Sequence, residues 1–502
     1  MWGKDSRENI WSTIERSWDL LVVGGGISGA GIFNYAARAG LRVLLVEAND
    51  FAFGASGRSG KQIQVWNDSG LPVEELVRER DRLLREAPNL VRSMACYQAA
   101  YPGQASSSWP GKSIPARDLT FEVPHLRTKG LSHGKRGEGA CLDDARLVLR
   151  LIREGVNYGG VAINYVRAEQ LLFTAYGQVC GAVLRDRAQG EDGRTAEAQA
   201  RGVINTSGTS CDELHSKAGG RRQLRQWIGS HLFLPGERLP LTCGLTVSHP
   251  RDGRPLSFIP WNGVVSVGGM HLEYRLPEDM AEPSISAQEI EYLLEGLKFA
   301  FPTLELGLGD VLACHAGVQQ TPEGTAAAPV LGTLREENGL VSVTGGRLGA
   351  FRLTAARALN ALRARLPGLR PFSADQPIFE PDGEMPYSTS LDPAGWSYLA
   401  GRYGRELPAL LASTPVDELQ SIYPQLPAMW AELHWAAHDG AVVHLDDLLL
   451  RRLRLGLQVK RGGLYEIEDM RAMIQPKLGW DNIRWQWEVA RYARIHELYY
   501  SV

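Results

Sequence analysis

Three glycines and one acid near the start of the chain have the spacing of a nucleotide-binding site. Gly24, Gly26 and Gly29 follow the G-x-G-x-x-G pattern, and Glu47 comes 18 residues after the last of them. The first glycine permits a tight turn, the second lets a pyrophosphate approach the backbone, and the third lets a helix pack closely on a strand. A carboxylate at this distance accepts hydrogen bonds from a ribose hydroxyl and repels a 2′-phosphate. The pattern therefore predicts a bound dinucleotide without a 2′-phosphate.

The segments around these residues are those that such a site requires. Residues 19–23 (DLLVV) and 42–46 (RVLLV) are short apolar runs, typical of strands buried on both faces. Between them, residues compatible with a helix continue to Gly40, where glycine favours a helix end. Backbone amides at the start of that helix can bind an anion. A plain tight turn is the alternative, but it would not require Glu47.

The residues that follow Glu47 indicate FAD as the dinucleotide. After the second strand come small hydroxylated and basic residues, namely Ser56, Arg58, Ser59 and Lys61. Such side chains can surround the other side of a pyrophosphate. Here the sequence resembles the FAD-dependent glycerol-3-phosphate dehydrogenases of the glycine/D-amino-acid-oxidase-like superfamily. Their pattern of an acid, Asp-Phe-Ala and Ser/Thr-Ser-x-Ser-x-Lys is matched by Glu47, residues 50–52, Ser56, Ser59 and Lys61.

The resemblance extends from about residue 19 to the C-terminus, and it implies FAD as the cofactor. The segments in family order are 141–155, 159–168, 200–208, 229–235, 258–269, 315–322 and 341–352, and 432–455 looks like the family's helical C-terminal domain. It implies that Val166 contacts adenine. The residues expected to hold the cofactor are Gly24, Gly26, Ile27, Ser28, Gly29, Glu47, Ala48, Ser56, Arg58, Ser59, Lys61, Val166, Gly208, Gly346, Arg347 and Leu348.

A glycine pair followed by an arginine, in TGGRLGAFR (344–352), suits the binding of a reduced flavin. Oxidation of an alcohol by flavin needs a base for the hydroxyl proton and positive charge near the flavin ring. Gly345 and Gly346 open a turn, and residues from Leu348 on can start a helix whose amides face an anion. We therefore predict Arg347 beside the flavin; an exposed loop arginine is the alternative.

His231 is the histidine that best suits the role of base or substrate contact. It lies between Ser230 and the apolar LFLP (232–235), in a family-like Ser-His pair. An imidazole with an ordinary pKa of about 6.5 can accept a hydroxyl proton. A buried structural histidine is the alternative. The histidines expected to be structural or at the surface are His271, His315, His434, His438 and His444.

The segments that would contact substrate depart from the family pattern. After its lysine the family reads Leu-Ile-His-Gly-Gly-Leu-Arg-Tyr-Leu, whereas this chain has Gln64 at the histidine position and lacks the glycine pair, arginine and tyrosine. The family's Gly-Val-Arg-Pro, whose arginine meets the substrate phosphate, is GVQQTP here, so Gln319 replaces a cation. Losing that charge-assisted bond costs a phosphate about 1.5–3 kcal/mol of binding free energy. The residues expected in the pocket are His231, Gln319, Arg347 and Arg352.

These substitutions leave four functions open. We favour a FAD-dependent dehydrogenase that transfers hydride to flavin N5 from a hydroxyl-bearing molecule other than glycerol 3-phosphate, such as a polyol, hydroxy acid or phosphonate. The alternatives are a true glycerol-3-phosphate dehydrogenase with substituted contacts, a flavin-binding subunit with little catalysis, and an amine or amino-acid oxidase. The resemblance implies quinone as electron acceptor, and oxygen or a protein acceptor also stays open.

The pattern of apolar and turn residues predicts three domains. Apolar runs on both sides of GEDG (190–193) predict a hairpin, and residues 72–87 predict an amphipathic helix. Residues 225–335 are strand-rich, residues 379–395 read as a linker, and only helices are expected after it. We predict an α/β fold with a doubly wound, glutathione-reductase-type FAD domain (15–90, 141–225 and 336–378), an inserted mixed-sheet α+β substrate domain (91–140 and 226–335) and an all-α C-terminal domain (385–502).

The composition is that of a folded globular protein, because 44% of the residues are hydrophobic and 22% charged. The 54 basic and 57 acidic residues nearly cancel, which gives no support for nucleic-acid binding. The six cysteines are scattered without a CxxC pair, so we expect reduced thiols, no metal site and a cytoplasmic protein. We expect neither a secretory signal nor a membrane-spanning helix, which needs about 20 apolar residues.

Two C-terminal stretches are candidates for contact with a membrane surface. Residues 451–463 (RRLRLGLQVKRGG) are basic with interleaved leucines, and residues 480–500 are rich in aromatics. Family members commonly sit on the inner face of the membrane, so the resemblance implies peripheral attachment. The alternative for the first stretch is a helix whose leucines face the core and whose arginines face solvent.

Overall fold

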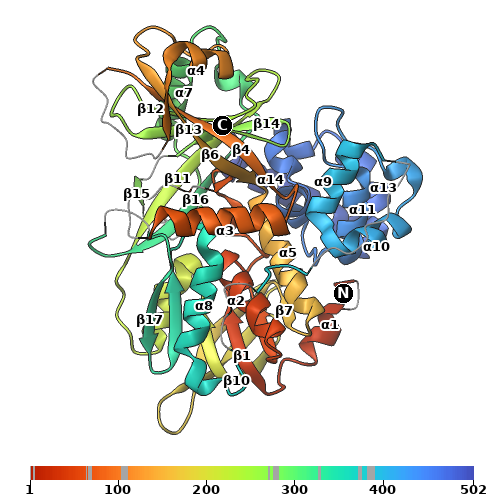
Figure 1. Ribbon diagram of the computed structural model, residues 1–502. Helices are drawn as coiled ribbons and strands as arrows, with labels where there is room; N and C mark the ends of the chain where they lie inside the picture. Colours follow the sequence, from red (N-terminus) through yellow and green to blue (C-terminus); the bar gives the residue numbers. More distant parts are fainter. Residues whose placement is uncertain are drawn as a thin grey trace.

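The protein consists of two β-sheets with their helices and a lobe of helices beside them (Figure 1). The two sheets lie toward opposite ends of the molecule, and the C-terminal helices, blue in Figure 1, lie to one side. This confirms the predicted α/β fold with a mixed second sheet and a helical C-terminal domain. The computed structural model describes residues 2–3, 6–63, 65, 71–102, 111–269, 272–274, 282–325, 329–370, 373, 376–380 and 391–502.

The first sheet has a parallel core covered by helices. Its strands in spatial order are β17 (Thr333–Glu337), β18 (Leu340–Thr344), β10 (Thr195–Asn205), β1 (Trp18–Val23), β2 (Val43–Val46) and β7 (Val161–Ile163). All neighbours are parallel except β17 and β18. The helices that belong to this sheet include α2 (Ile27–Arg38), α5 (Asp144–Asn157), α6 (Cys211–Lys217) and α8 (Phe351–Ala361). The predicted strands 19–23 and 42–46 match β1 and β2 to within one residue.

A hairpin extends the first sheet. Strand β9 (Val179–Asp186) runs antiparallel to the first half of β10, and β8 (Val166–Phe173) runs antiparallel to β9. The turn between β9 and β10 contains GEDG, so the predicted hairpin is confirmed.

The second sheet is mixed. Its strands in spatial order are β15 (Leu272–Tyr274), β11 (Leu224–Pro235), β14 (Val264–Gly268), β13 (Pro255–Trp261), β12 (Gly244–Ser248), β4 (Val91–Ala100), β6 (His133–Leu142) and β3 (Gln62–Ile63), with β16 (Ala313–Pro322) on β11 and β5 (Lys112–Pro115) on β6. Among the described pairs only β4 and β12 are parallel. Helix α7 (Ala287–Ala300) packs Leu293 and Leu297 into the core of this sheet.

Helices α1 (Ser6–Trp11), α3 (Val73–Glu86) and α4 (Ala116–Glu122) complete the two sheet domains. Helix α3 matches the predicted helix 72–87 and buries Leu76 and Leu83. The C-terminal lobe contains α9 (Pro393–Tyr403), α10 (Leu407–Ser413), α11 (Trp430–Asp439), a π-helix (Asp447–Arg452), α12 (Leu455–Gln458), α13 (Ile467–Leu478) and α14 (Asn482–Tyr499). Residues 381–390 of the predicted linker lie outside the described residues.

The arginines of the 451–455 stretch are buried, so the prediction that they face solvent is wrong. Arg451, Arg452 and Arg454 are 3%, 1% and 2% exposed. Arg451 and Arg452 form ion pairs with Asp50, and Arg454 pairs with Asp144. A guanidinium can be buried when an acid pairs with it. These three side chains are therefore unavailable for contact with a membrane.

Candidate functional site

The loop between β1 and α2 needs glycine for steric reasons. Gly24 has φ +114°, and a Cβ there would lie 2.4 Å from the carbonyl oxygen of Thr206. A Cβ at Gly29 would lie 1.9 Å from the carbonyl oxygen of Gly24. The backbone N–H of Ile27 donates to Oγ of Ser56 at 2.9 Å. The 12-residue helix α2 begins directly after this loop, and the backbone N–H groups at a helix start can bind an anion.

Glu47 borders the same loop from the end of β2. Its Oε2 accepts a hydrogen bond from the N–H of Gly25 at 2.7 Å, and its Oε1 accepts one from the N–H of Asn49 at 2.8 Å. Burial raises the pKa of Glu47, and these backbone N–H groups oppose that rise. The N–H of Val166 donates to the carbonyl oxygen of Glu47 at 2.7 Å, so the start of β8 lies beside the acid. Gly208 has φ +57° and lies two residues after Thr206, whose carbonyl oxygen faces Gly24.

A second loop, residues 54–61, is held by Asp144 in the first turn of α5. Asp144 accepts hydrogen bonds from Lys61 Nζ at 2.8 Å and from the backbone N–H and Oγ of Ser59 at 2.9 and 2.8 Å. Arg454 donates to Asp144 at 2.9 Å and to the carbonyl oxygen of Gly57 at 2.9 Å. The C-terminal lobe therefore contributes directly to this loop.

The charges in this cluster stabilise one another. Burial alone would raise the pKa of Asp144, but Lys61 and Arg454 more than offset it and lower that pKa to about 2. Burial, together with the charge of Arg454, lowers the pKa of Lys61 to about 8. Neither Asp144 nor Arg454 was among the residues predicted from the sequence. The signals for Asp144 are its place at the start of a helix after a strand, in CLDDARL, and the family resemblance of residues 141–155.

Arg58 connects the same loop to two distant parts of the chain. Its guanidinium forms a buried ion pair with Glu282 and donates to the hydroxyl of Tyr500 at 2.9 Å. The loop predicted to face the pyrophosphate is therefore held from both the segment that precedes α7 and the C-terminal lobe.

Two histidines lie together beneath this loop. His231 on β11 is opposite His315 on β16, and their ring centroids are 5.4 Å apart. A Cβ at Gly60 would lie 2.9 Å from Cε1 of His231, so the ring borders the loop. Burial, and then the charges of Lys61 and His231, hold the pKa of His315 well below its ordinary value. Neither ring nitrogen of His315 has a hydrogen-bond partner within the described part of the chain. A surface position for His315 is excluded.

The turn after β18 and the end of β16 approach each other. A Cβ at Gly345 would lie 3.0 Å from the carbonyl oxygen of Gln320. A Cβ at Gly349 would lie 2.8 Å from Cγ2 of Ile63, so the turn also borders the end of the 54–61 loop. Gly346 has φ +91°, and Arg347 is half-buried with its N–H bonded to the carbonyl oxygen of Val330 at 2.8 Å. Leu348 then begins a short helix that leads into α8.

Gln319 and Arg352 lie in different surroundings. Gln319 is exposed on β16, opposite Trp227 on β11. Arg352 is 4% exposed and forms a buried ion pair with Glu79 of α3. This ion pair joins α3 to α8, and a role for Arg352 toward substrate stays a prediction. Gln64 and His271 lie outside the described residues.

Comparison with known proteins agrees with this arrangement. A family model described as FAD dependent oxidoreductase matches residues 19–362, and one described as the C-terminal domain of alpha-glycerophosphate oxidase matches residues 357–484. The chain belongs to the FAD-dependent oxidoreductase family. FAD is its cofactor, and the helix start after the glycine loop, the glycines without room for a Cβ and the half-buried acid fit that group.

Several relatives match most of this FAD-dependent oxidoreductase. It is 28% identical to a glycerol-3-phosphate dehydrogenase of Mycobacterium leprae, over 98% of this chain and 91% of the relative. It is 27% identical to an aerobic glycerol-3-phosphate dehydrogenase of Staphylococcus epidermidis, over 70% of this chain and 68% of the relative. The structure of a glycerol-3-phosphate dehydrogenase from Bacillus halodurans complexed with FAD has a TM-score of 0.81 at 25% identity, covering 99% of this chain and 97% of that one.

Proposed function

We propose that this protein is a FAD-dependent dehydrogenase that oxidises a hydroxyl-bearing small molecule other than glycerol 3-phosphate. It is related to the glycerol-3-phosphate dehydrogenases and oxidases through the C-terminal family model and its relatives. The observation that supports a changed substrate is the exposed Gln319 at the place of the arginine that, by resemblance, meets phosphate. A neutral amide does not replace a bidentate arginine.

We assign the cofactor to the two loops described above. The glycine loop and Glu47 would hold the ADP part, residues 56–61 the pyrophosphate and flavin side, and Arg347 the flavin ring. Bound FAD supplies the hydride acceptor. Two observations support this assignment: Arg347 is half-buried, and Gly349 in the same segment approaches Ile63, just after the 54–61 loop.

His231 is our candidate for the base that takes the hydroxyl proton. Its ring borders Gly60, and its Nδ1 lies 3.5 Å from Oγ of Ser266. His315 beside it stays neutral because burial and nearby cations hold its pKa well below the ordinary value, which leaves His231 as the candidate of the two. His231→Gln should lower kcat and remove a limb of the pH–rate profile while FAD stays bound.

The substrate is tested by anaerobic reduction of bound flavin. Glycerol 3-phosphate should reduce the flavin only at high concentration, whereas an uncharged or differently charged polyol or hydroxy acid should reduce it readily. Gln319→Arg should improve the KM for glycerol 3-phosphate about ten- to a hundredfold, which corresponds to about 1.5–3 kcal/mol. Gln199→Arg, on an exposed position of β10, is the matched control and should change nothing.

Other outcomes point to the other functions. Reduction of the unaltered protein by micromolar glycerol 3-phosphate would mean a true glycerol-3-phosphate dehydrogenase. Reduction by amines or amino acids alone would mean an oxidase for those compounds. A flavin that none of these compounds reduces would favour a flavin-binding subunit without catalysis.

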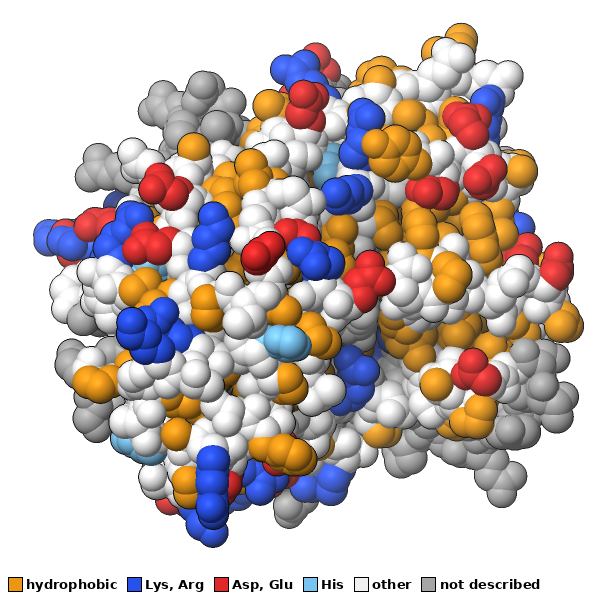
Figure 2. Space-filling model, turned by 90° about the horizontal axis from the view of Figure 1, so that it is seen from above, with side chains coloured by type: hydrophobic (Ala, Val, Ile, Leu, Met, Phe, Trp, Pro, Cys, Tyr) orange, Lys and Arg blue, Asp and Glu red, His pale blue; other side chains and the backbone are white. Residues whose placement is uncertain are grey.

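We also propose a cytoplasmic protein that passes electrons to quinone while α14 touches the inner face of the membrane. Ile483, Trp487 and Leu498 are 79%, 49% and 52% exposed, and their spacing places them on one face of α14. Arg494 is exposed on the same helix, where it can meet anionic lipid. Figure 2 shows hydrophobic side chains among charged ones on the side that the C-terminal helices form. None of the helices in the described ranges is long and apolar enough to cross a bilayer.

Sedimentation with anionic liposomes tests this contact. The protein should pellet with them, and Trp487→Asp should weaken pelleting. Val416→Asp, at a position that is 69% exposed outside α14, is the control and should not. Equal pelleting of all three proteins would exclude α14 as the contact.

A further inference from the structure

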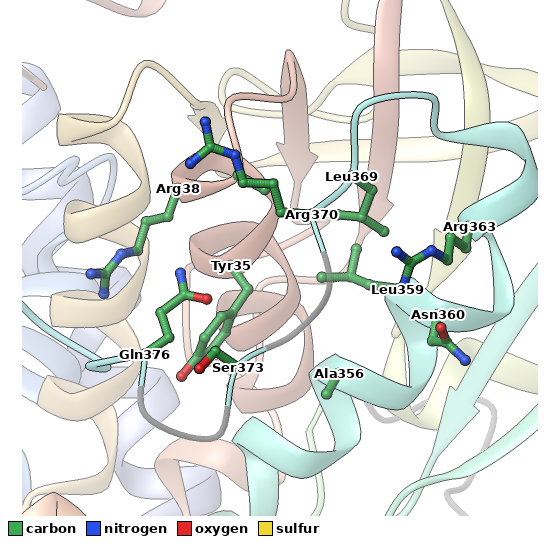
Figure 3. Close-up of a pocket in the computed structure, with 11 residues that line it drawn as sticks. Tyr35, Arg38, Ala356, Leu359, Asn360, Arg363, Leu369, Arg370, Ser373 and Gln376 are labelled. Atoms are coloured by element: carbon green, nitrogen blue, oxygen red, sulfur yellow. The ribbon is translucent and has the colours of Figure 1, made fainter.

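A cavity of about 320 Å³ lies where α2 and α8 end (Figure 3). Tyr35 and Gln376 are on one side of it in Figure 3, and Leu359, Asn360 and Arg363 are on the other. A volume of this size is at the lower end of the range of about 300–1,000 Å³ that small-molecule sites occupy.

The cavity is separate from the proposed FAD site. Helix α2 begins at the glycine loop, and its last residues line the cavity. Helix α8 begins shortly after Arg347, and its last residues also line the cavity. These helices have 12 and 11 residues, so at about 1.5 Å per residue they span about 15–18 Å. One end of each helix borders the candidate cofactor site, and the other end borders the cavity.

The charge of the cavity is positive. Arg38, Arg363 and Arg370 line it, and no acid is among its described lining residues. Arg38 is already used, because it donates to the carbonyl oxygen of Ile378 at 2.8 Å and pairs with Glu380 at 2.9 Å. Arg363 and Arg370 are exposed, and neither forms an ion pair with any acid that the structure describes. Two guanidinium groups at the cavity are thus available to a ligand.

The remaining walls are partly apolar and partly polar. Leu359, Leu369 and Ala356 supply apolar surface, while Asn360 and Gln376 supply amides. A bare inorganic ion would leave the apolar walls without a partner. A ligand that satisfies the whole lining has an anionic group and an apolar body.

We infer that this cavity binds a small organic anion, a carboxylate or phosphate carried on an apolar body. The two helices present their C-terminal ends here, and these ends carry partial negative charge that disfavours an anion. Binding therefore depends on Arg363 and Arg370, which form charge-assisted hydrogen bonds with the anionic group.

The test is calorimetric titration of the FAD-loaded protein with octanoate, octyl phosphate and inorganic phosphate. Octanoate or octyl phosphate should bind with one site per chain and more tightly than inorganic phosphate. Arg363→Gln combined with Arg370→Gln should weaken that binding about tenfold or more. Arg357→Gln, an exposed arginine of α8 outside the cavity, is the matched control and should leave it unchanged.

Three results would overturn the inference. The first is no binding of octanoate or octyl phosphate at millimolar concentration. The second is equal binding by inorganic phosphate, because the apolar walls would then play no part. The third is an equal loss in Arg357→Gln and the cavity variant. Arg347→Ala separates this site from the proposed active site, since binding of the probe should be unaffected in that variant.

Discussion

Asp144→Asn should release the loop at residues 54–61 and reduce the amount of FAD that the protein retains. The carboxylate accepts hydrogen bonds from Lys61, Ser59 and Arg454, and Asp144 and Lys61 are 0% exposed. An asparagine keeps the size of the side chain but removes the negative charge and turns an N–H₂ group toward two cations. Breaking a buried ion pair on one side typically costs about 3–5 kcal/mol.

The free energy lost with this ion pair sets how often the 54–61 loop is open. At about 1.4 kcal/mol per power of ten, a loss of 3–5 kcal/mol shifts the equilibrium between ordered and open loop by about two to three and a half powers of ten. The assay is the flavin content of purified protein from its absorbance, together with the melting temperature after FAD is added back. We expect substoichiometric flavin and a lowered melting temperature.

The control is Asp118→Asn, which removes the same charge from an exposed ion pair with Arg117. An exposed pair contributes about 0–1 kcal/mol, so this variant should retain its flavin. Full flavin content in Asp144→Asn, with a melting temperature equal to that of the control, would refute the view that this carboxylate orders the cofactor loop.

Three more predictions concern the same region. Gly29→Ala should abolish FAD binding, because its Cβ would lie 1.9 Å from the Gly24 carbonyl oxygen. Gly309→Ala, with open space around it in a short helix outside both cofactor loops, should bind FAD normally, and flavin absorbance compares the two variants. Arg347→Ala should slow flavin reduction in stopped-flow traces while FAD stays bound, and loss of FAD instead would reassign Arg347 to cofactor retention. Because the pKa of Asp144 is lowered to about 2, its stabilisation is complete above its ordinary pKa of 3.8 and is lost as pH falls toward 2. Melting curves from pH 5 to 2 should therefore converge for the unaltered protein and Asp144→Asn, and parallel curves would contradict this assignment.

The strands and turns of the first sheet could be predicted because their signals are local. A buried parallel strand is a continuous apolar run, and Gly24 and Gly29 mark a turn with no room for a side chain. The hairpin around GEDG is also a local signal, and it follows the predicted course.

The groups that hold the second loop could not be predicted, because their partners are distant in sequence. Asp144 and Arg454 are 310 residues apart, and no local pattern relates them. Residues 448–455 (LLLRRLRL) mix leucines and arginines in a pattern that fits a helix with one solvated face, yet Arg452 is 1% exposed and pairs with Asp50. Periodicity reports which residues are apolar and cannot show that a charged residue is buried against an acid elsewhere in the chain. His315 lies beside His231 because β11 pairs with β16, and the sequence alone does not give that pairing.

The contact between Arg454 and the 54–61 loop also has a consequence for biosynthesis. A ribosome that adds about 5–20 residues per second needs about 15–60 s to proceed from Asp144 to Arg454. Throughout that interval the nascent loop lacks one of its buried cations, although the glycine turn and the first strands have already emerged. Insertion of the flavin is therefore expected after translation has passed residue 454, and premature termination upstream of that codon should yield colourless polypeptide.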